Sequence, residues 1–372
     1  MTLNTNEPMC TNSSGSTIVL KHDSLLIQHD WNEVKNDFIN VIKTEGSIES
    51  GLNDAKIEKL STQKIRVKYA DYEEKLFIAP SVELKSLHNA SINSIDLSPS
   101  GNLIASGDSE GVLKIWNART GEVQRNYLGH IMDINKCRFF PSGMQVASCG
   151  LDMTVRIWSL SGGGELNDLS NPNVLKGHTR SVLDLVIVDG GEILVSVGKD
   201  GTTRHWDCIS GKNLQTLSLD LGSLNAVAVK DTSTIAYGSE TGRVVIYDLK
   251  TSENVFTFAI GASCTSLYFW GDFLYCGTEN GEIHCFSTSK RQAHSVLKTS
   301  NGKVTEMSSC SLGLLASFND GTLVVFPLPL TAANALVEFT GSDVDPILDF
   351  THSEDVLFSA CRDKTIRKYH LK

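Results

Sequence analysis

The feature that most constrains the fold is a strand ending that recurs along the chain about every 40 residues. Seven aromatic residues close similar strand-like segments, of which LKIWN, VRIWS and TRHWD are the clearest: Trp116, Trp158, Trp206, Tyr247, Phe286, Phe326 and Tyr369. A repeat of this length is typical of a propeller blade made of four strands. The sequence therefore predicts an all-β chain with a seven-bladed β-propeller over residues 82–372.

Three of the repeats also share a fixed spacing of polar residues. An acid follows a histidine by 22 residues, a serine precedes the acid by four, and the tryptophan follows it by six. The three sets are His88, Ser106, Glu110 and Trp116; His130, Ser148, Asp152 and Trp158; and His178, Ser196, Asp200 and Trp206. We expect each set to form a buried hydrogen-bonded tetrad that holds the strands of one blade together. A geometry repeated three times indicates architecture rather than catalysis.

Turn signals and composition favour the same fold. Asp200-Gly201, Asn280-Gly281 and Asp320-Gly321 are typical of tight hairpins, and the chain has 30 glycines against 8 prolines. The last repeat ends at IRKYHL without room for a fourth strand, so an exposed sheet edge would remain. The alternating residues 82–87 directly precede the first repeat, and we expect them to supply that missing strand.

The residues in front of the propeller predict an appendage. Polar residues 1–15 are expected to be disordered, and residues 16–81 are expected to form a small α/β domain. Strands are predicted over 17–28, 63–69 and 75–78. Asp30 and Glu33 resemble a helix capping box, and apolar residues at helical spacing, among them Val34 and Phe38, predict a helix that stops near Gly46.

Charge and cysteine content exclude several classes of function. The formal charge is −10 and no Lys/Arg-rich block is present, so we expect no nucleic acid partner. No apolar run approaches a membrane span, and the N-terminus lacks the pattern of a signal peptide. Nine scattered cysteines without a CxxC pair predict reduced thiols in a cytoplasmic protein, with the nucleus as a second location, and no metal or cofactor site.

Beyond the repeat pattern, longer stretches resemble known proteins. The histidine, acid and tryptophan spacing resembles the WD40 repeat family, whose fold is a β-propeller. GHIMDINKCRFFPSGMQVASCGLDMTVRIWS at 129–159, LDLVIVDGGEILVSVGKDGTTRHWDC at 183–208, and the terminal SDVDPI and CRDKTIRKYHL are similar to the family of proteasomal ATPase-associated factors. The likeness is weakest over the fourth to sixth repeats, and IQHDW at 27–31 and FIAP at 77–80 extend it to the N-terminal region.

The resemblance implies a non-catalytic assembly chaperone for the base of the 19S proteasome regulatory particle. Such a protein binds the C-terminal domain of an ATPase subunit, is a monomer before binding and needs no cofactor. We expect the partner surface on the rim that carries the tetrad loops, because acids gather there in the second half of the ring. The candidate contact residues are Glu240, Glu279, Asp343 and Asp345. These carboxylates would steer a basic partner toward the rim. The ATPase subunit bound, and whether the interface is the rim or the side of the ring, stay open.

Two alternatives are kept. One is a substrate receptor of a cullin-type ubiquitin ligase or another scaffold, because Trp116-Asn117-Ala118-Arg119 looks like the Trp-Asp-x-Arg ending of such receptors. The other is an enzyme with a site in the central channel of the propeller, which would require clustered titratable residues that face the channel. The recurring acid and histidine pairs are already assigned to the tetrads, so the sequence offers no candidate for that cluster.

Overall fold

A computed structural model describes most of the chain. The described residues are 17–21, 24–28, 36–40, 42–44, 47–49, 55–69, 74–161, 167–168, 172–330, 335–342 and 345–371. Of residues 17–57, 69 and 167–168, the structure describes the backbone alone. The predicted disordered segment 1–15 and Asp343 lie outside the described residues.

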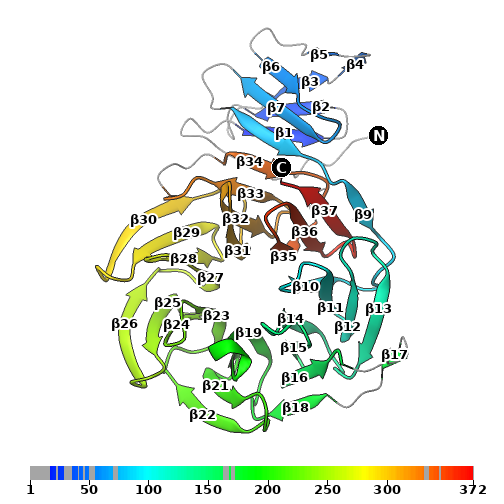
Figure 1. The fold of residues 1–372 in the computed structure, drawn as a ribbon. Coiled ribbons are helices and arrows are strands. Elements are labelled where there is room, and N and C mark those ends of the chain that lie inside the picture. The colour runs from blue at the N-terminus through cyan, green and yellow to red at the C-terminus, as the bar shows by residue number, and fades with distance from the viewer. Residues whose placement is uncertain are drawn as a thin grey trace.

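The main body is a ring of antiparallel sheets around a central channel (Figure 1). Each sheet places its first strand next to the channel, and each of these inner strands contacts the inner strand of the following sheet, with the last contacting the first. The inner strands are β10 (Ile92–Leu97), β14 (Ile134–Phe139), β19 (Val182–Val188), β23 (Leu224–Val229), β27 (Cys264–Trp270), β31 (Val304–Cys310) and β35 (Ile347–His352). We name each blade by its inner strand.

The second and third strands of the blades follow outward from the channel. The second strands are β11 (Leu103–Asp108), β15 (Gln145–Gly150), β20 (Ile193–Gly198), β24 (Thr234–Ser239), β28 (Phe273–Thr278), β32 (Gly313–Phe318) and β36 (Val356–Cys361). The third strands are β12 (Val112–Asn117), β16 (Thr154–Ser159), β21 (Thr202–Asp207), β25 (Arg243–Asp248), β29 (Glu282–Ser287), β33 (Leu323–Phe326) and β37 (Ile366–His370). The seven predicted aromatic endings each lie on the third strand of a different sheet.

The outer strands complete the blades. They are β13 (Val123–Leu128), β18 (Asn173–Lys176), β22 (Asn213–Ser218), β26 (Glu253–Ala259), β30 (Gln292–Lys298), β34 (Val337–Phe339) and β9 (Val82–Leu84). β9 comes from the other end of the propeller sequence and pairs antiparallel with β37, Glu83 lying opposite Arg367. This pairing covers the edge of the last sheet, which is the role expected for residues 82–87. The prediction of an all-β propeller is confirmed.

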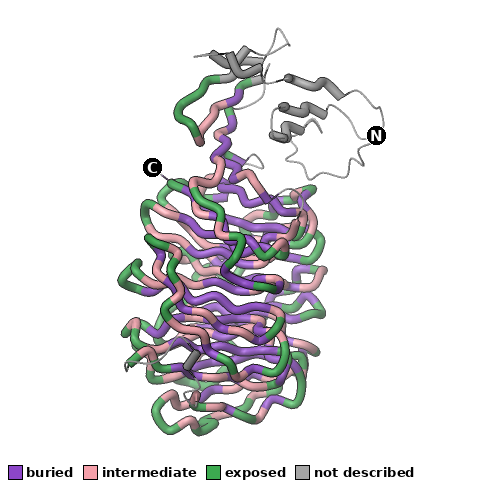
Figure 2. Tube along the Cα trace, turned by 90° about the vertical axis from the view of Figure 1, so that its right-hand side faces the viewer, coloured by how far each residue is buried: buried purple, intermediate pink, exposed green. Residues whose placement is uncertain are grey.

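The hydrophobic core lies between neighbouring blades rather than at the centre of the ring. One cluster packs Cys149 and Val155 of the β14 blade against Leu185, Leu194 and Trp206 of the β19 blade. In Figure 2 the buried segments run through the interior of the ring, while exposed residues gather in the loops at its two faces. Each blade therefore buries both faces of its sheet, which explains the continuous apolar runs of the second strands.

The N-terminal residues form strands where a helix was predicted. β1 (Thr17–Lys21), β2 (Ser24–Gln28) and β3 (Asn36–Asn40) form one antiparallel sheet, and β4 (Ile42–Thr44) pairs with β5 (Ser47–Glu49). The helix predicted from Asp30 to Gly46, and with it the α/β class of the appendage, is wrong for the described residues. Asn36, Asp37 and Asn40 are weak helix formers, and in β3 the backbone pairs with β2 instead.

Three further N-terminal strands continue a blade of the propeller. β6 (Ala55–Lys59), β7 (Lys64–Tyr69) and β8 (Lys75–Ile78) form an antiparallel meander, and β8 pairs in parallel with β34. The sheet that begins with β31 thus extends outward to β6 (Figure 1). A buried ion pair of 2.5 Å between Lys75 and Glu338 lies at this junction. The appendage is therefore joined edge to edge with the propeller.

Two short elements interrupt the pattern. β17 (Asn167–Asp168) lies in the long connection after β16 and pairs with β13 of the preceding blade. A 3₁₀ turn, η1 (Asp189–Gly191), joins β19 to β20. Among the residues that the structure describes, no helix is long and apolar enough to cross a membrane.

Candidate functional site: the mouth of the central channel

Three blades contain hydrogen-bonded tetrads beside the channel rim. In the β14 blade, His130 contacts Asp152 at 2.9 Å and Ser148 at 2.7 Å, and the Trp158 indole N–H donates to Ser148 Oγ at 2.8 Å. The β19 blade repeats this arrangement with His178, Ser196, Asp200 and Trp206, over 2.8 to 2.9 Å. The imidazoles, serines and indoles are buried, so their polar atoms serve the fold.

The tetrad of the β10 blade differs from the prediction in its acid. His88 contacts Ser106 at 2.7 Å, but its second ring nitrogen contacts Asp108 at 2.8 Å rather than Glu110. Asp108 also accepts hydrogen bonds from the backbone N–H groups of Glu110 and Val112. The assignment of Glu110 to the tetrad is wrong, because the shorter acid at the end of β11 already closes the turn and leaves Glu110 exposed.

Burial sets the protonation of the tetrads. It lowers the pKa of His130 and of His178 below their usual range, more strongly than the nearby carboxylates raise it. Burial alone would raise the pKa of Asp152, but the His130 ring and the hydroxyl and N–H of Thr154 lower it to about 2. Each pair is therefore a neutral imidazole beside a carboxylate at neutral pH, a stable hydrogen-bonded arrangement rather than a poised acid and base.

A β-bulge recurs in the inner strand of every blade and sets which side chains face the channel. The register shifts at one residue near the start of each inner strand. In five blades this residue reaches a carbonyl oxygen of the next blade: Asn93 to Ile134, Asn135 to Val182, Asn225 to Cys264, Thr265 to Val304 and Thr305 to Ile347, at 2.6 to 3.1 Å. The bulges therefore connect neighbouring sheets in addition to aiming side chains inward.

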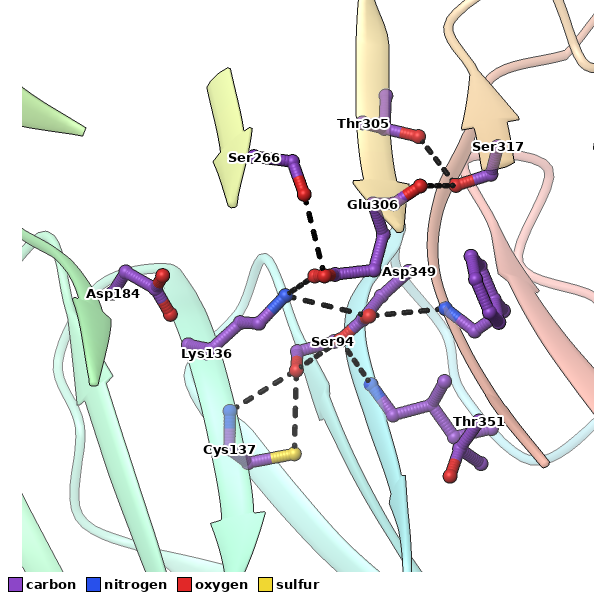
Figure 3. A network of polar contacts seen from close by, with 12 residues as sticks. Ser94, Lys136, Cys137, Asp184, Ser266, Thr305, Glu306, Ser317, Asp349 and Thr351 are labelled. Atoms are coloured by element: carbon purple, nitrogen blue, oxygen red, sulfur yellow. Dashed lines mark hydrogen bonds and ion pairs between the residues drawn. The ribbon is translucent and has the colours of Figure 1, made fainter. Parts of the chain in front are cut away.

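Charged side chains meet inside the channel, a cluster that sequence reasoning missed. Lys136 of β14 makes ion pairs with Glu306 of β31 and, at 3.4 Å, with Asp349 of β35. Arg138 lies 3.3 Å from Asp349 and 3.5 Å from Glu306. Figure 3 shows Lys136 with Glu306 and Asp349. Burial alone would lower the pKa of both cations, but the surrounding carboxylates, Asp349 foremost, outweigh it and raise both values. The cations are therefore held by residues from across the ring.

Asp349 links the last blade to the first. Its carboxylate accepts hydrogen bonds from Ser94 Oγ at 2.6 Å and from the Ile95 N–H at 3.1 Å, and none of its side chain is exposed. Burial would raise the pKa of Asp349, but Lys136, Arg138 and the Ser94 hydroxyl outweigh burial and hold it below its usual value. Ring closure thus uses this buried carboxylate as well as the β9–β37 pairing.

Two other channel acids are less well compensated. Asp96 accepts a hydrogen bond from the Phe139 N–H at 2.7 Å, and Asp184 accepts one from the Val227 N–H at 2.9 Å. Burial raises the pKa of each to about 6, although Arg138 and Lys136 oppose the shift. Each acid bonds to the backbone of the following blade, so these titratable residues have structural partners. An enzyme site in the channel would require titratable residues that face it. Such acids are present, but each accepts a hydrogen bond from the backbone of the next blade.

A signal for the channel cluster was present in the sequence. In the inner strand INKCRFF, Lys136 and Arg138 stand two residues apart on either side of Cys137. Alternation indicates that these side chains share one face. The pairing of this face with Glu306, 170 residues away, could not be read from any local pattern.

The channel is a cavity of about 1450 Å³, and its mouth at one end is charged. Six exposed charged residues of the loops and turns line this end: Arg180, Lys199, Asp220, Glu240, Glu279 and Lys303. Three neighbouring acids lie on the β23 and β27 blades, so the mouth has an acidic arc, which we define as Asp220, Glu240 and Glu279. All three are exposed. An acidic arc over a rigid frame attracts a basic surface and favours its encounter.

The predicted contact residues separate in the structure. Glu240 and Glu279 lie in the turns after β24 and β28, and their N–H groups donate to Ser223 and Ser263, which places both on the arc. Asp345 does not line the mouth, and its carboxylate pairs with Arg362 at 2.9 Å. Asp220 was not predicted, because it stands before β23 where three other repeats have the tetrad histidine, and the prediction took acids of this blade only from the turn between the second and third strands. No group of three metal-ligating residues occurs among the described positions.

The strand ending that suggested a ubiquitin ligase receptor acts as a turn cap. Asn117 Oδ1 accepts the backbone N–H groups of Arg119 and Thr120. Asp207 and Asp248 cap the equivalent turns of two other blades in the same way. This position is therefore explained by local backbone hydrogen bonding, and Arg119 is an exposed residue of the same turn.

Comparison with known proteins agrees with this architecture. The family model for the WD domain, G-beta repeat, matches residues 82–117, 121–159 and 170–207. The chain is 33% identical to the human protein Proteasomal ATPase-associated factor 1 and 31% identical to that of Bos taurus, over 79% of each chain in both cases. It is 28% identical to Nuclear distribution protein nudF 1 of Talaromyces marneffei, over 54% of this chain and 42% of that protein. The likeness to the two factors spans most of both chains, so this WD40-repeat propeller belongs to the family of Proteasomal ATPase-associated factor 1.

Proposed function

We propose that this protein is a non-catalytic chaperone that binds the C-terminal domain of a proteasomal ATPase subunit during assembly of the regulatory particle base. The observation that carries the proposal is the acidic arc at the channel mouth, on a chain whose relatives are named for association with proteasomal ATPases. A basic face of the ATPase domain would lie against Asp220, Glu240 and Glu279. The protein would act in the cytoplasm, and in the nucleus as well, as a monomer until it binds.

The mechanism is steric and electrostatic. The tetrads hold the strands within a blade, and the bulge residues and the channel ion pairs tie the blades together, so the arc is held in one geometry before the partner arrives. A preformed surface loses little conformational entropy on binding. A propeller bound to one ATPase subunit would block contact between that subunit and the proteolytic core until the base is complete. No step of this mechanism requires bond making or breaking.

The test measures binding of the full chain to recombinant C-terminal domains from each proteasomal ATPase subunit. Glu240→Lys with Glu279→Lys removes two attractions and adds two repulsions, each about 0.5 kcal/mol at an exposed site, so we expect a roughly 30-fold weaker complex. Glu122→Lys with Glu253→Lys is the matched control. Both glutamates are exposed and follow the third strand of their blade, at the end away from the mouth: Glu122 lies between β12 and β13, and Glu253 begins β26. Equal weakening by both pairs would indicate a general charge effect and contradict the proposed surface.

The contribution of Asp345 is tested separately. Its pairing with Arg362 leaves less of its charge available to a partner. We expect Asp345→Lys to change the affinity by less than about three-fold, the range of an exposed ion pair. If no ATPase domain binds the unmodified chain, and a cullin ligase adaptor binds it instead, the receptor alternative replaces the proposal.

A further inference from the structure

Four exposed apolar side chains gather at the rim of the β14 blade. Ile131, Met132, Leu151 and Met153 have exposed fractions of 83%, 47%, 38% and 45%, and we call these four residues the Met153 patch. The first two precede β14, and the last two lie in the turn between β15 and β16. The Leu151 N–H donates to Asp133 O at 2.9 Å, which holds loop and turn together. Single exposed apolar residues are ordinary, but four on one rim segment indicate a contact surface.

The patch is specific to this blade. The tetrad of the β19 blade provides an internal alignment, in which His178 and Asp200 stand where His130 and Asp152 stand in the β14 blade. The positions equivalent to the four patch residues are Thr179, Arg180, Lys199 and Gly201. The fold therefore does not require apolar residues at these positions, because the same frame carries polar ones in the next blade.

Met153 occupies a backbone conformation that disfavours its side chain. The turn between the second and third strands ends in every blade with a left-handed residue whose N–H bonds three residues back. Glycine occupies this position in five blades: Gly111, Gly201, Gly242, Gly281 and Gly321. Met153, with φ of 64°, and Lys364, with φ of 68°, are the exceptions. A methionine kept in this conformation carries strain that glycine would avoid, so its side chain has a use on the rim.

The charges next to the patch define what its partner must carry. Arg180 and Lys199 are exposed on the adjacent β19 blade and line the channel mouth. Neither makes an ion pair with another residue in the described part of the chain. An apolar surface bordered by two available cations complements apolar side chains accompanied by carboxylates. The acidic arc begins beyond these cations, at Asp220.

We propose that the Met153 patch and the Arg180–Lys199 pair bind a polypeptide segment of the partner in which apolar side chains are accompanied by acidic residues. The apolar side chains cover the patch, and the carboxylates reach the two cations. The identity of the partner rests on the proposed function, whereas the chemistry of the segment does not. A partner that used both surfaces would lay an apolar and acidic segment on the β14 and β19 blades and a basic face on the acidic arc.

The first experiment tests the chemistry of the segment without any known partner. A displayed library of short random peptides is selected on the full chain and on the variant Ile131→Thr with Met153→Gly, both residues taken from the β19 blade. We expect the unmodified chain to enrich peptides that combine apolar and acidic residues, and the variant to lose that enrichment. Glycine suits the left-handed turn, so the melting temperature of the variant should not fall. The absence of enrichment, or equal enrichment by both proteins, overturns the inference.

The second experiment uses the ATPase domain that binds the unmodified chain. Ile131→Thr with Met153→Gly should weaken that complex by about ten-fold or more, because buried apolar contacts dominate interfaces. Arg180→Glu with Lys199→Glu should weaken it by a similar factor that shrinks at high salt. Ile209→Thr is the control, since Ile209 is 89% exposed but lies in the β21–β22 loop, at the other end of the third strand.

The two proposals fail in different ways. Suppose that an ATPase domain binds and that the affinities of the patch variants lie within about two-fold of that of the unmodified chain. This difference is smaller than the effect of one important interface residue, so the inference would be wrong and the proposed function would stand. If no ATPase domain binds while the peptide selection succeeds, the patch is a docking surface and the proposed function is wrong.

Discussion

Replacement of Asp349 by asparagine should destabilise the whole ring. The Asp349 side chain is completely buried, lies 3.4 Å from Lys136 Nζ and 3.3 Å from Arg138, and accepts hydrogen bonds from Ser94 and Ile95. Asparagine keeps the shape but removes the charge, which leaves Glu306 as the remaining ion-pair partner of both cations. Breaking a buried ion pair from one side costs about 3–5 kcal/mol, a large part of the roughly 5–15 kcal/mol that stabilises a folded protein. We expect a loss of about 3 kcal/mol, the lower end of the first range, because the asparagine side chain retains one oxygen that can accept a hydrogen bond from Ser94 or Ile95.

The assay is urea unfolding followed by tryptophan fluorescence, with Asp345→Asn as the matched control. That control removes the same charge from an exposed pair, where a loss of about 0–1 kcal/mol is expected. The pKa of Asp349 is lower in the folded than in the unfolded protein, so its contribution is present above the unfolded value near 3.8 and disappears as the pH falls below it. The difference between the two variants should therefore persist from pH 5 to 8. Equal losses for both variants would refute the role assigned to the channel cluster.

Three further outcomes follow from the described contacts. Asp108→Asn should lower the free energy of unfolding by about 2 kcal/mol, and Glu110→Gln by less than about 0.5 kcal/mol. Urea unfolding would distinguish these losses, and a larger loss for Glu110→Gln would show that Glu110 belongs to the tetrad. Burial lowers the pKa of His205 to about 4. Between about pH 6.5 and 4 the unfolded chain therefore binds a proton at this residue that the folded chain does not, and the free energy of unfolding decreases as the pH falls through this range. His205→Gln should reduce the loss of stability between pH 7 and 5 by about 1–2 kcal/mol, and an unchanged loss would contradict this assignment. Asn225→Leu removes the two hydrogen bonds that Asn225 Nδ2 donates to Ser263 Oγ and Cys264 O of the next blade, and should cost about 2 kcal/mol in urea unfolding. A loss below about 0.5 kcal/mol would show that these bonds add little to the contact between blades.

The acidic arc was predictable only in part. Glu240 and Glu279 stand in turns that the repeat marks, so their place on the rim followed from the spacing alone. Asp220 lies four residues before β23, the place that the tetrad histidine takes before β14 and β19, but the fourth repeat has no histidine there to mark the position. Asp345 showed the opposite error, because nothing local reveals that its carboxylate pairs with Arg362 from the neighbouring turn. Charge along the sequence therefore indicated the half of the ring that carries the acidic arc, but not every residue of the arc.

The N-terminal helix failed for a related reason. Apolar spacing at Val34 and Phe38 matched a helical period, but a short amphipathic pattern carries little energy compared with a strand pairing offered by residues nearby. The extension of the β31 blade by β8 was equally invisible, because Leu76 lies opposite Val337 and a parallel pairing over that separation has no local signature. Local propensity decides an element only where tertiary partners do not compete.

The sequence by itself determined the repeating unit: the strands, the tight turns, the aromatic endings and two complete tetrads. These features depend on residues within about 40 positions of one another, so their spacing records their geometry. The tertiary structure alone decided how the units meet, including the ion pairs of Lys136 and Arg138 across the channel, the choice of Asp108 over Glu110, and the contact of the β14 blade with the β19 blade. These contacts join segments whose separation along the chain varies freely, and only closure of the ring brings them together.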